Sequence, residues 1–536
     1  MKKLFLLSAI VILFYGFSFA QSVGIGTTSP NTSSMLEIKS SNKGLLIPRT
    51  STTSRTAIIN PAKGLMVYDT STSSFWFHNG SAWTQIEASG NNWSLAGNTS
   101  TNPGTNFIGT SDANSLTIKV NNQRSGYIDY TSPYKANFGY QSLNSAFGLA
   151  NSAFGYQALF TDTSGSYNTA HGYQSLYSNS MGSFNTAIGT SSLNHNSTGN
   201  YNTAGGYYSL YSNIDGYSNT ASGYYALYAN NYGHGNSAFG TNALNSNTSA
   251  IYNSAFGYAS LYSNSTGVYN TACGSAALYN NNGSYNTAAG FEALRLNNDS
   301  YNTAFGYQAL RNTTASEYNV AFGYNAGTTL NNGYNNVFLG ANTDVNGIGY
   351  YNVIAIGQAT VCTAASQVTM GNSATSSYRA YANWSNISDG RYKNNVREDV
   401  PGLTFINELR PVTYTLDATG IDQFLHKNSS ADKKLNTESK AVQVKALREK
   451  EQVRYTGFVA QEVEEAAKKL GFDFSGIDAP KNENDLYALR YADFVVPLVK
   501  AVQEQQQIIE QQKNDIEALK IQVAELTKTV DTLMSK

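Results

Sequence analysis

Charged side chains are scarce in this chain: they make up 13% of its 536 residues, about half the share in an average globular protein. Lysine plus arginine (34) nearly balance aspartate plus glutamate (35), so no basic excess points to nucleic acid or an anionic membrane. Only 2 cysteines and 5 histidines are present, which excludes a disulfide scaffold and argues against structural zinc. We therefore expect no metal, no cofactor and no nucleic-acid partner.

Small polar residues, 46 glycines and 39 tyrosines take the place of charge. This composition argues against an ordinary α/β enzyme. The charges are also unevenly distributed, with 9 in the 237 residues of 135–371 and 45 in the 149 residues of 388–536. The chain therefore joins two physically different regions.

Residues 1–20 have the order of a signal peptide. Lys2 and Lys3 give a basic start, residues 4–17 are almost unbroken apolar, and small residues precede a cleavage point after Ala20. The alternative is an uncleaved membrane anchor, because the apolar run is near the lower length limit for a span. We expect an exported protein at the cell surface or outside the cell.

Residues 21–134 contain short apolar runs between turn residues, which predicts a β-rich N-terminal region. Trp76, Trp83 and Trp93 fit either buried packing or a ligand platform, and we expect packing. The opening 23–30 resembles the starts of exported surface proteins of Bacteroidota-type bacteria, a likeness that implies no activity.

Residues 135–371 repeat a unit of the form Asn-Thr-Ala-x-Gly-x-x-Ala/Ser-Leu. Successive units are 17 residues apart, with two steps of 16. A short period with one glycine-centred strand and one leucine per unit is typical of a β-solenoid. The expected fold is therefore mainly β, with this array as a shaft. The repeated glycine stands at 155, 172, 189, 206, 223, 240, 257, 274, 290, 306, 323, 340 and 357.

Positions in each unit are counted here from that glycine. In a strand, the Thr at −3 and the residue at −1 share one face, and the Ala at −2 points to the other. Because position −1 is mostly apolar, as at Phe154, Ile188 and Phe239, we expect it to face the core. The Ala ladder would then form a flat outer face that suits a neighbouring chain. Asn side chains at −4 are expected to hydrogen-bond along the rod.

This layout resembles the β-roll heads of trimeric adhesins, which implies the architecture and not an adhesive target. The acidic residues of the array occupy no repeated pair of positions, so the array lacks the two facing carboxylates that a glycosidase needs. Tyrosines could stack on sugars or on each other across turns, and we expect the latter. A cell-surface or glycan ligand of the shaft stays possible but unidentified. Cys273 and Cys362 lie too many turns apart to form a disulfide.

At Ser388 the composition changes, after a short linker at 372–387. Four ordered blocks follow: Ser-Asp-Gly-Arg-Tyr-Lys (388–393), Leu-Arg-Pro-Val-Thr-Tyr (409–414), Gly-Phe-Val-Ala-Gln-Glu-Val (457–463) and Leu-Arg-Tyr-Ala-Asp-Phe-Val-Val-Pro-Leu (489–498). Together with a helical tail, they resemble the intramolecular chaperone auto-processing domain of endosialidase tailspikes, other tail fibres and myelin regulatory factor. The resemblance implies a small α+β chaperone domain over 388–497 and a coiled coil over 498–536.

The same resemblance implies that the domain trimerises, sets three chains in register and then cleaves itself off beside the serine of its first block. Mapped here, Ser388 is the nucleophile and Lys393 the base. A serine needs a base, and a free lysine with a pKa of about 10.4 is protonated at neutral pH unless burial lowers its pKa. Their spacing does not place both on one helical face, so we expect a turn or strand. The bond cut is either Ile387–Ser388, which we favour, or Ser388–Asp389, and the lysine acts within its own chain or across chains.

The tail shows six heptads. β-Branched residues at a with leucine at d normally favour two strands, whereas the family resemblance implies three, which we adopt. Position a is Val495, Val502, Ile509, Ile516, Val523 and Val530; position d is Leu498, Gln505, Gln512, Leu519, Leu526 and Leu533.

The sequence thus predicts an exported trimeric fibre or adhesin-like protein with a single-turnover serine endopeptidase as its only activity. One alternative is an uncleaved adhesin that keeps the C-terminal domain as a trimerisation clamp. Another is a phage-derived tail fibre, against which the signal peptide argues.

Overall fold

The computed structural model describes residues 22–86, 101–102, 104–130, 134–144, 148–427 and 437–535. The predicted signal peptide and Trp93 lie outside these residues. The chain divides into two compact units, 1–108 and 109–536. Among the helices so described, none is long and apolar enough to cross a membrane.

The first unit consists of short strands. β1 (Val23–Ile25) pairs in parallel with β2 (Leu36–Ile38). A separate four-stranded sheet follows, beside the short helix α2 (Thr52–Thr56). Its order is β3 (Arg49–Thr50), β4 (Met66–Asp69), β5 (Ser74–His78) and β6 (Trp83–Ile86).

A buried ion pair joins the helix α2 to the strand β4 of that sheet. The Arg55 Nε donates to the Asp69 carboxylate at 2.8 Å, and the Arg55 guanidinium lies 3.7 Å from the ring centre of Trp76 and 5.5 Å from that of Trp83. Burial alone would raise the pKa of Asp69, but hydrogen bonds from Arg55, Thr52 and two backbone amides lower it to about 2. Both rings are half-buried and pack against Arg55, and the choice between a packing role and a ligand platform stays a prediction.

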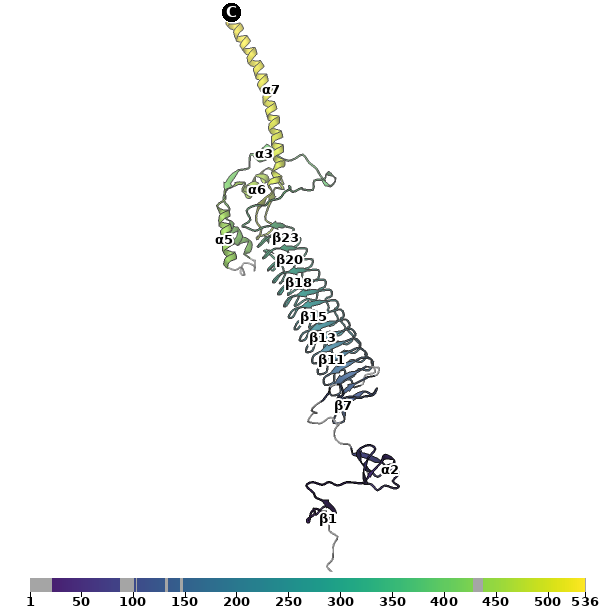
Figure 1. The fold of residues 1–536 in the computed structure, drawn as a ribbon. Coiled ribbons are helices and arrows are strands. Elements are labelled where there is room, and N and C mark those ends of the chain that lie inside the picture. Colours follow the sequence, from purple (N-terminus) through teal and green to yellow (C-terminus); the bar gives the residue numbers. More distant parts are fainter. Residues whose placement is uncertain are drawn as a thin grey trace, which may run out of the picture. The chain divides into compact units, whose positions relative to one another are not determined.

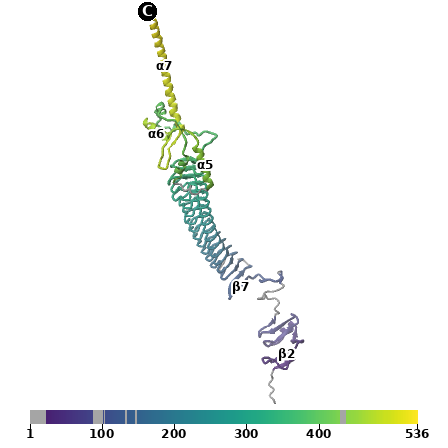
Figure 2. The same ribbon diagram turned by 90° about the vertical axis from the view of Figure 1, so that its left-hand side faces the viewer.

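The second unit begins with an antiparallel pair, β7 (Leu116–Val120) and β8 (Gln123–Ile128), which leads into β9 (Ala136–Phe138). From β9 onward the strands form one parallel ladder, seen as stacked arrows in Figure 1 and from the side in Figure 2. Each strand aligns with its equivalent one repeat later, so Ala170 faces Ala187. The β-solenoid prediction is confirmed. The following strands are β10 (Ser152–Phe154), β11 (Thr169–His171), β12 (Thr186–Ile188), β13 (Thr203–Gly205), β14 (Thr220–Ser222), β15 (Ser237–Phe239), β16 (Ser254–Phe256), β17 (Thr271–Cys273), β18 (Thr287–Ala289), β19 (Thr303–Phe305), β20 (Val320–Phe322), β21 (Val337–Leu339), β23 (Ile354–Ile356) and β25 (Val368–Met370), with β22 (Asp344–Val345) and β24 (Val361–Cys362) paired beside them.

The prediction for the two strand faces is wrong. The alanines at −2 are fully buried, whereas the residues at −1, such as Phe239 and Phe256, point outward. The leucines at +4, for example Leu227, are also fully buried and fill the interior together with alanines at −2 and +3. Because leucine already occupies this narrow interior, most strands contribute only a methyl group. In β21 the fully buried Phe338 takes the place of alanine, and Gly327 stands where the preceding turns have leucine.

Two columns of asparagine complete the interior, so the predicted hydrogen bonding along the rod is confirmed. At −4, the amide of Asn185 donates to the side-chain oxygen of Asn168 at 3.0 Å. At +7, Asn196 Nδ2 donates to Asn179 Oδ1 at 2.7 Å, and Asn213 repeats the bond to Asn196 at 2.7 Å. These side chains satisfy buried polar groups that three-residue strands leave unpaired.

The repeated glycine cannot carry a side chain. Gly206 has a φ of +137°, and a Cβ there would lie 2.6 Å from the carbonyl oxygen of Gly223 in the next turn. Neighbouring Gly205, at −1, has no such restriction, since a Cβ added there would lie 3.9 Å from its nearest neighbour, the Ser222 hydroxyl oxygen. The glycine column therefore sets how closely the turns stack.

Aromatic rings stack from turn to turn on the outside, which confirms the predicted cross-turn stacking. Tyr252, Tyr269, Tyr285, Tyr301 and Tyr318 form one such column, with ring centres 4.9–5.3 Å apart.

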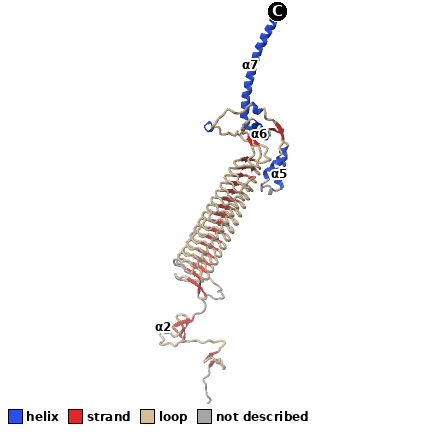
Figure 3. Cartoon of the chain, turned by 180° about the vertical axis from the view of Figure 1, so that it is seen from behind, coloured by secondary structure: helices blue, strands red, loops and turns tan. Residues whose placement is uncertain are grey.

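The helices of the second unit gather in the C-terminal module, blue in Figure 3. Phe405, Val463, Phe474 and Phe494 form its small core. Residues 418–426 and 437–450 of this module are helical, and Lys450 Nζ donates to the carbonyl oxygen of Ser373 at 2.8 Å. The elements are α3 (Leu403–Ile406), β26 (Val412–Tyr414), α4 (Ala418–His426), α5 (Thr437–Glu451), β27 (Tyr455–Gly457), α6 (Ala460–Lys469), β28 (Ile477–Asp478), β29 (Ala488–Leu489), the 3₁₀ turn η3 (Tyr491–Phe494) and α7 (Val495–Met534).

The tail is one 40-residue helix, α7, as the heptads predict. Its a and d side chains are exposed in the single chain, for example Val523 (62%) and Leu526 (69%). The pairing of this helix in a coiled coil stays a prediction.

Candidate functional site

The turn at Ser388 is built by local hydrogen bonds. Asp389 caps the 3₁₀ turn η1 (Gly390–Tyr392) by accepting a hydrogen bond from the Arg391 amide at 2.9 Å. The amide of Lys393 then donates to the Gly390 carbonyl at 3.2 Å. This reversal of the chain brings residue 393 back toward residue 388.

The Lys393 Nζ lies 2.7 Å from the Ser388 Oγ, within hydrogen-bond distance. The two predicted site residues therefore meet, and they do so across a turn, one of the two geometries expected from their spacing. This is the heavy-atom distance at which a base can accept a hydroxyl proton. Both side chains are exposed, and Ile387, the residue before the serine, is 97% exposed.

The carboxylate beside this pair is neutralised by a different cation. Arg391 Nε lies 3.1 and 3.0 Å from the two carboxylate oxygens of Asp389, and the hydrogen bonds from Arg391 lower the pKa of Asp389. Asp389 therefore stands in this turn as one half of an ion pair with Arg391 and not as a free carboxylate.

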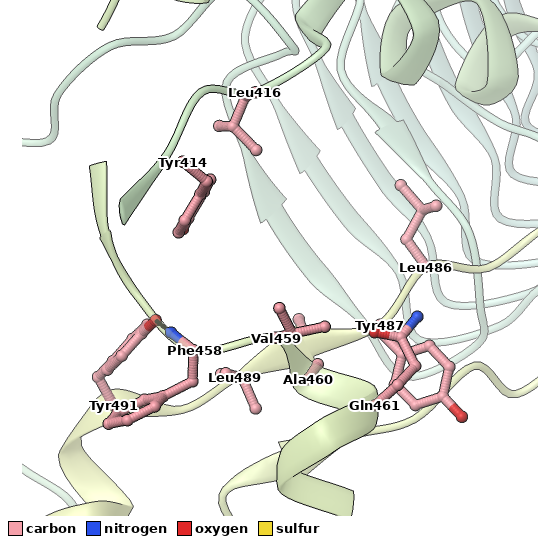
Figure 4. A pocket seen from close by; sticks show the side chains of 11 residues that line it. Tyr414, Leu416, Phe458, Val459, Ala460, Gln461, Leu486, Tyr487, Leu489 and Tyr491 are labelled. Atoms are coloured by element: carbon pink, nitrogen blue, oxygen red, sulfur yellow. Dashed lines mark hydrogen bonds between the residues drawn. The ribbon is translucent and has the colours of Figure 1, made fainter. Parts of the chain in front are cut away.

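The other three sequence blocks meet elsewhere, around an apolar pocket shown in Figure 4. The Phe458 amide donates to the Tyr491 hydroxyl at 3.2 Å, and β26 pairs with β27 through Tyr414 and Tyr455. A Cβ on Gly457 would lie 2.3 Å from the Tyr491 hydroxyl, so a larger residue there would displace the Tyr491 side chain from this contact. These blocks thus hold the module together, whereas Ser388 lies outside the pocket lining.

In the part of the chain that the structure describes, no three His, Cys, Asp or Glu side chains lie together as a candidate metal site. The acidic side chain of the Ser388 turn, Asp389, is already paired with Arg391.

Two family models match the chain. Residues 388–472 match the model described as chaperone of endosialidase, and residues 24–103 match a phage tail like trimerisation region. No curated protein and no solved structure matches. The second family was missed from the sequence, where residues 23–30 suggested only a general likeness to surface proteins.

The matches and the fold together describe a trimeric, tail-fibre-like protein with a chaperone domain. Its C-terminal module, which opens at Ser388, is similar to the chaperone-of-endosialidase family over residues 388–472.

Proposed function

We propose that the C-terminal module assembles three chains of an exported fibre and then cuts itself off at Ser388. The observation that carries this proposal is the 2.7 Å contact between Lys393 Nζ and Ser388 Oγ. The match of 388–472 to an endosialidase chaperone supports it independently.

The favoured reaction begins with transfer of the Ser388 hydroxyl proton to neutral Lys393. The Oγ then attacks the carbonyl carbon of Ile387, the peptide C–N bond breaks, and the Ser388 nitrogen takes the proton. Water hydrolyses the resulting ester, which leaves a carboxylate on Ile387 and a free N-terminal serine. Attack at the Ser388–Asp389 bond remains the alternative.

Cleavage follows assembly because the single chain leaves both reacting groups in water. A lysine acts as a base only when neutral, and burial favours the neutral form. Two further copies packed around the turn would supply that burial. The cut would then report on correct assembly.

The test is the mass of the purified full-length protein and of its variants. Self-cleavage at the favoured bond gives residues 388–536, a fragment of 149 residues beginning with serine. Ser388→Ala should abolish the cut and leave the trimer intact, and Lys393→Arg should also fail because arginine stays protonated. Ser385→Ala, an exposed serine on the same segment, is the matched control and should cleave normally.

The outcomes also decide between the alternatives. An intact chain in the trimeric wild type would favour the permanent clamp over self-cleavage. A fragment that persists in Ser388→Ala would assign the cut to another protease.

Export is the second part of the proposal and rests on the signal-like residues 1–20. Expression with and without this segment should give extracellular protein beginning at Gln21 only in the first case. Retention inside the cell of both forms would overturn export and fit a phage-type tail fibre.

A further inference from the structure

We propose that three copies of the shaft pack against one another through the outward face of their strands. This inference rests on the homotrimer proposed above and assigns its contact surface. The surface, called here the strand face, consists of the side chains at −3 and −1 of the parallel strands. It replaces the Ala ladder, which is buried inside each chain.

The strand face exposes large apolar side chains in most turns, although His171, Gly205, Ser222, Cys273 and Ala289 interrupt the series at −1. Phe239, Phe256 and Phe322 are 39%, 42% and 44% exposed. Their rings stack along the rod, with Phe239 5.2 Å from Phe256 and Phe305 4.7 Å from Phe322. Exposed apolar patches that extend along a protein mark interaction sites.

In the described strands from β10 to β25, no charged residue lies on this face. The charges that the array does carry occupy other columns, such as Glu292 at +2 and Arg311 at +5, which form an ion pair at 2.7 Å. A face without charge can be buried against another chain without leaving a charge unpaired.

The face becomes wholly apolar toward the C-terminal module. Most turns have threonine or serine at −3, but the last ones have Val320, Val337, Ile354 and Val368. The same strands have Phe322, Leu339, Ile356 and Met370 at −1. The strongest apolar contact is therefore offered beside the module that brings the three chains together.

Tyrosines flank the strand face on the next column, at +1. Tyr207 stacks on Tyr224 at 5.4 Å, and Tyr307 stacks on Tyr324 at 5.1 Å. A tyrosine keeps its hydroxyl in water while its ring extends the apolar area. An apolar centre with such a rim is the usual build of protein interfaces.

The occupant is a second copy because each chain carries an assembly segment on either side of the array, at 24–103 and from 388 onward. Chains aligned at both ends place equal turns at equal heights. Phenylalanine then meets phenylalanine, and the apolar end meets the apolar end.

Cys273 offers a built-in test, since it is exposed at −1 in the middle of the array. Cys362 is buried, and burial raises the pKa of its thiol to about 11, so it stays unreactive. Mild oxidation of the full-length trimer should join two chains through Cys273 and leave the third single, provided that their Cα atoms approach within about 7 Å. Before oxidation, a bulky maleimide should react with Cys273 at least about tenfold more slowly in the trimer than in the unfolded chain.

The matched control moves the thiol to another face in the Cys273→Ser, Thr266→Cys variant, since Thr266 is exposed at +9. This thiol should label rapidly and form no disulfide within the trimer. If both thiols label equally fast in a protein of trimeric mass, the strand face is exposed to solvent in the trimer and the inference is overturned. Such a result would instead fit a strand face that is open for a ligand. A monomeric mass would instead overturn the proposed trimer itself.

Discussion

The array and the C-terminal module solve the problem of burial in different ways. Within the array, each turn buries its leucine and alanine against the turns of the same chain, so Leu227 and Ala221 have no exposed surface. In the module, the helix α7 leaves its apolar a and d positions in water. One chain therefore completes the core of the shaft, whereas α7 leaves its apolar positions open to the partners that the coiled-coil prediction expects.

This difference explains why a chaperone is joined to the shaft. Near-identical turns specify register weakly, because a shift by one repeat again places glycine on glycine and alanine on alanine. A heptad helix with Gln505 and Gln512 in its apolar seam specifies alignment more sharply. We expect the module to supply the register that the repeats lack.

The largest expected effect contrasts the two kinds of leucine. Leu227→Ala should destabilise the array by about 3–5 kcal/mol, because it opens a cavity in a core that one chain has already closed. The loss, measured by denaturant unfolding, should not depend on protein concentration.

Its counterpart is Leu526→Ala in α7, which should act only through association. The variant should lower the apparent melting temperature more at low protein concentration than at high. A concentration-independent effect would mean that α7 is buried by its own chain and would remove the contrast.

The next largest loss of stability is expected from substitution of the repeated glycine. Gly206→Ala forces a side chain into a φ of +137° and toward the Gly223 carbonyl, so we expect a loss of about 2–4 kcal/mol. Gly205→Ala, one residue earlier, meets no atom closer than 3.9 Å and should be close to neutral in the same thermal-unfolding experiment. Equal effects would show that loss of glycine flexibility, and not turn stacking, is being measured.

The sequence predicted the repeat period, the glycine position and the C-terminal helix, because each leaves a regular pattern. It failed on the strand faces, since a strand of three residues, such as Ser237, Ala238 and Phe239, is too short for alternation to identify the inner side. The expectation that the largest apolar residue of a strand faces inward fails here, because Leu244 of the same repeat, in the loop after the strand, already fills the interior. The contact of Ser388 with Lys393 was predicted only from the family resemblance, and the spacing excluded one helical face but left both a turn and a strand open.

The smallest effect concerns pH, where the two regions should respond in opposite directions. In the array, burial raises the pKa of Asp344 to about 6 despite hydrogen bonds from Thr329, Val345 and Thr328. In the module, Lys468 lowers the pKa of Glu464. Acid should therefore favour the folded array while it weakens this contact of the module.

The sign for Asp344 follows from linkage. An unfolded aspartate ionises near pH 3.9, whereas the folded one keeps its proton until about pH 6, so array stability should fall by about 1–3 kcal/mol between these values and then level off. Asp344→Asn removes the titrating group, and its amide can retain the contacts with the backbone of Thr329 and Val345. Circular dichroism melts at pH 4, 5, 6 and 7 should show that stability falls less steeply with rising pH in the variant than in the wild type. Part of the fall will remain, because burial also raises the pKa of Asp162 to about 6. If the variant and the wild type show the same slope, Asp344 is not a source of the pH dependence, and its burial imposes no cost on the folded shaft at neutral pH.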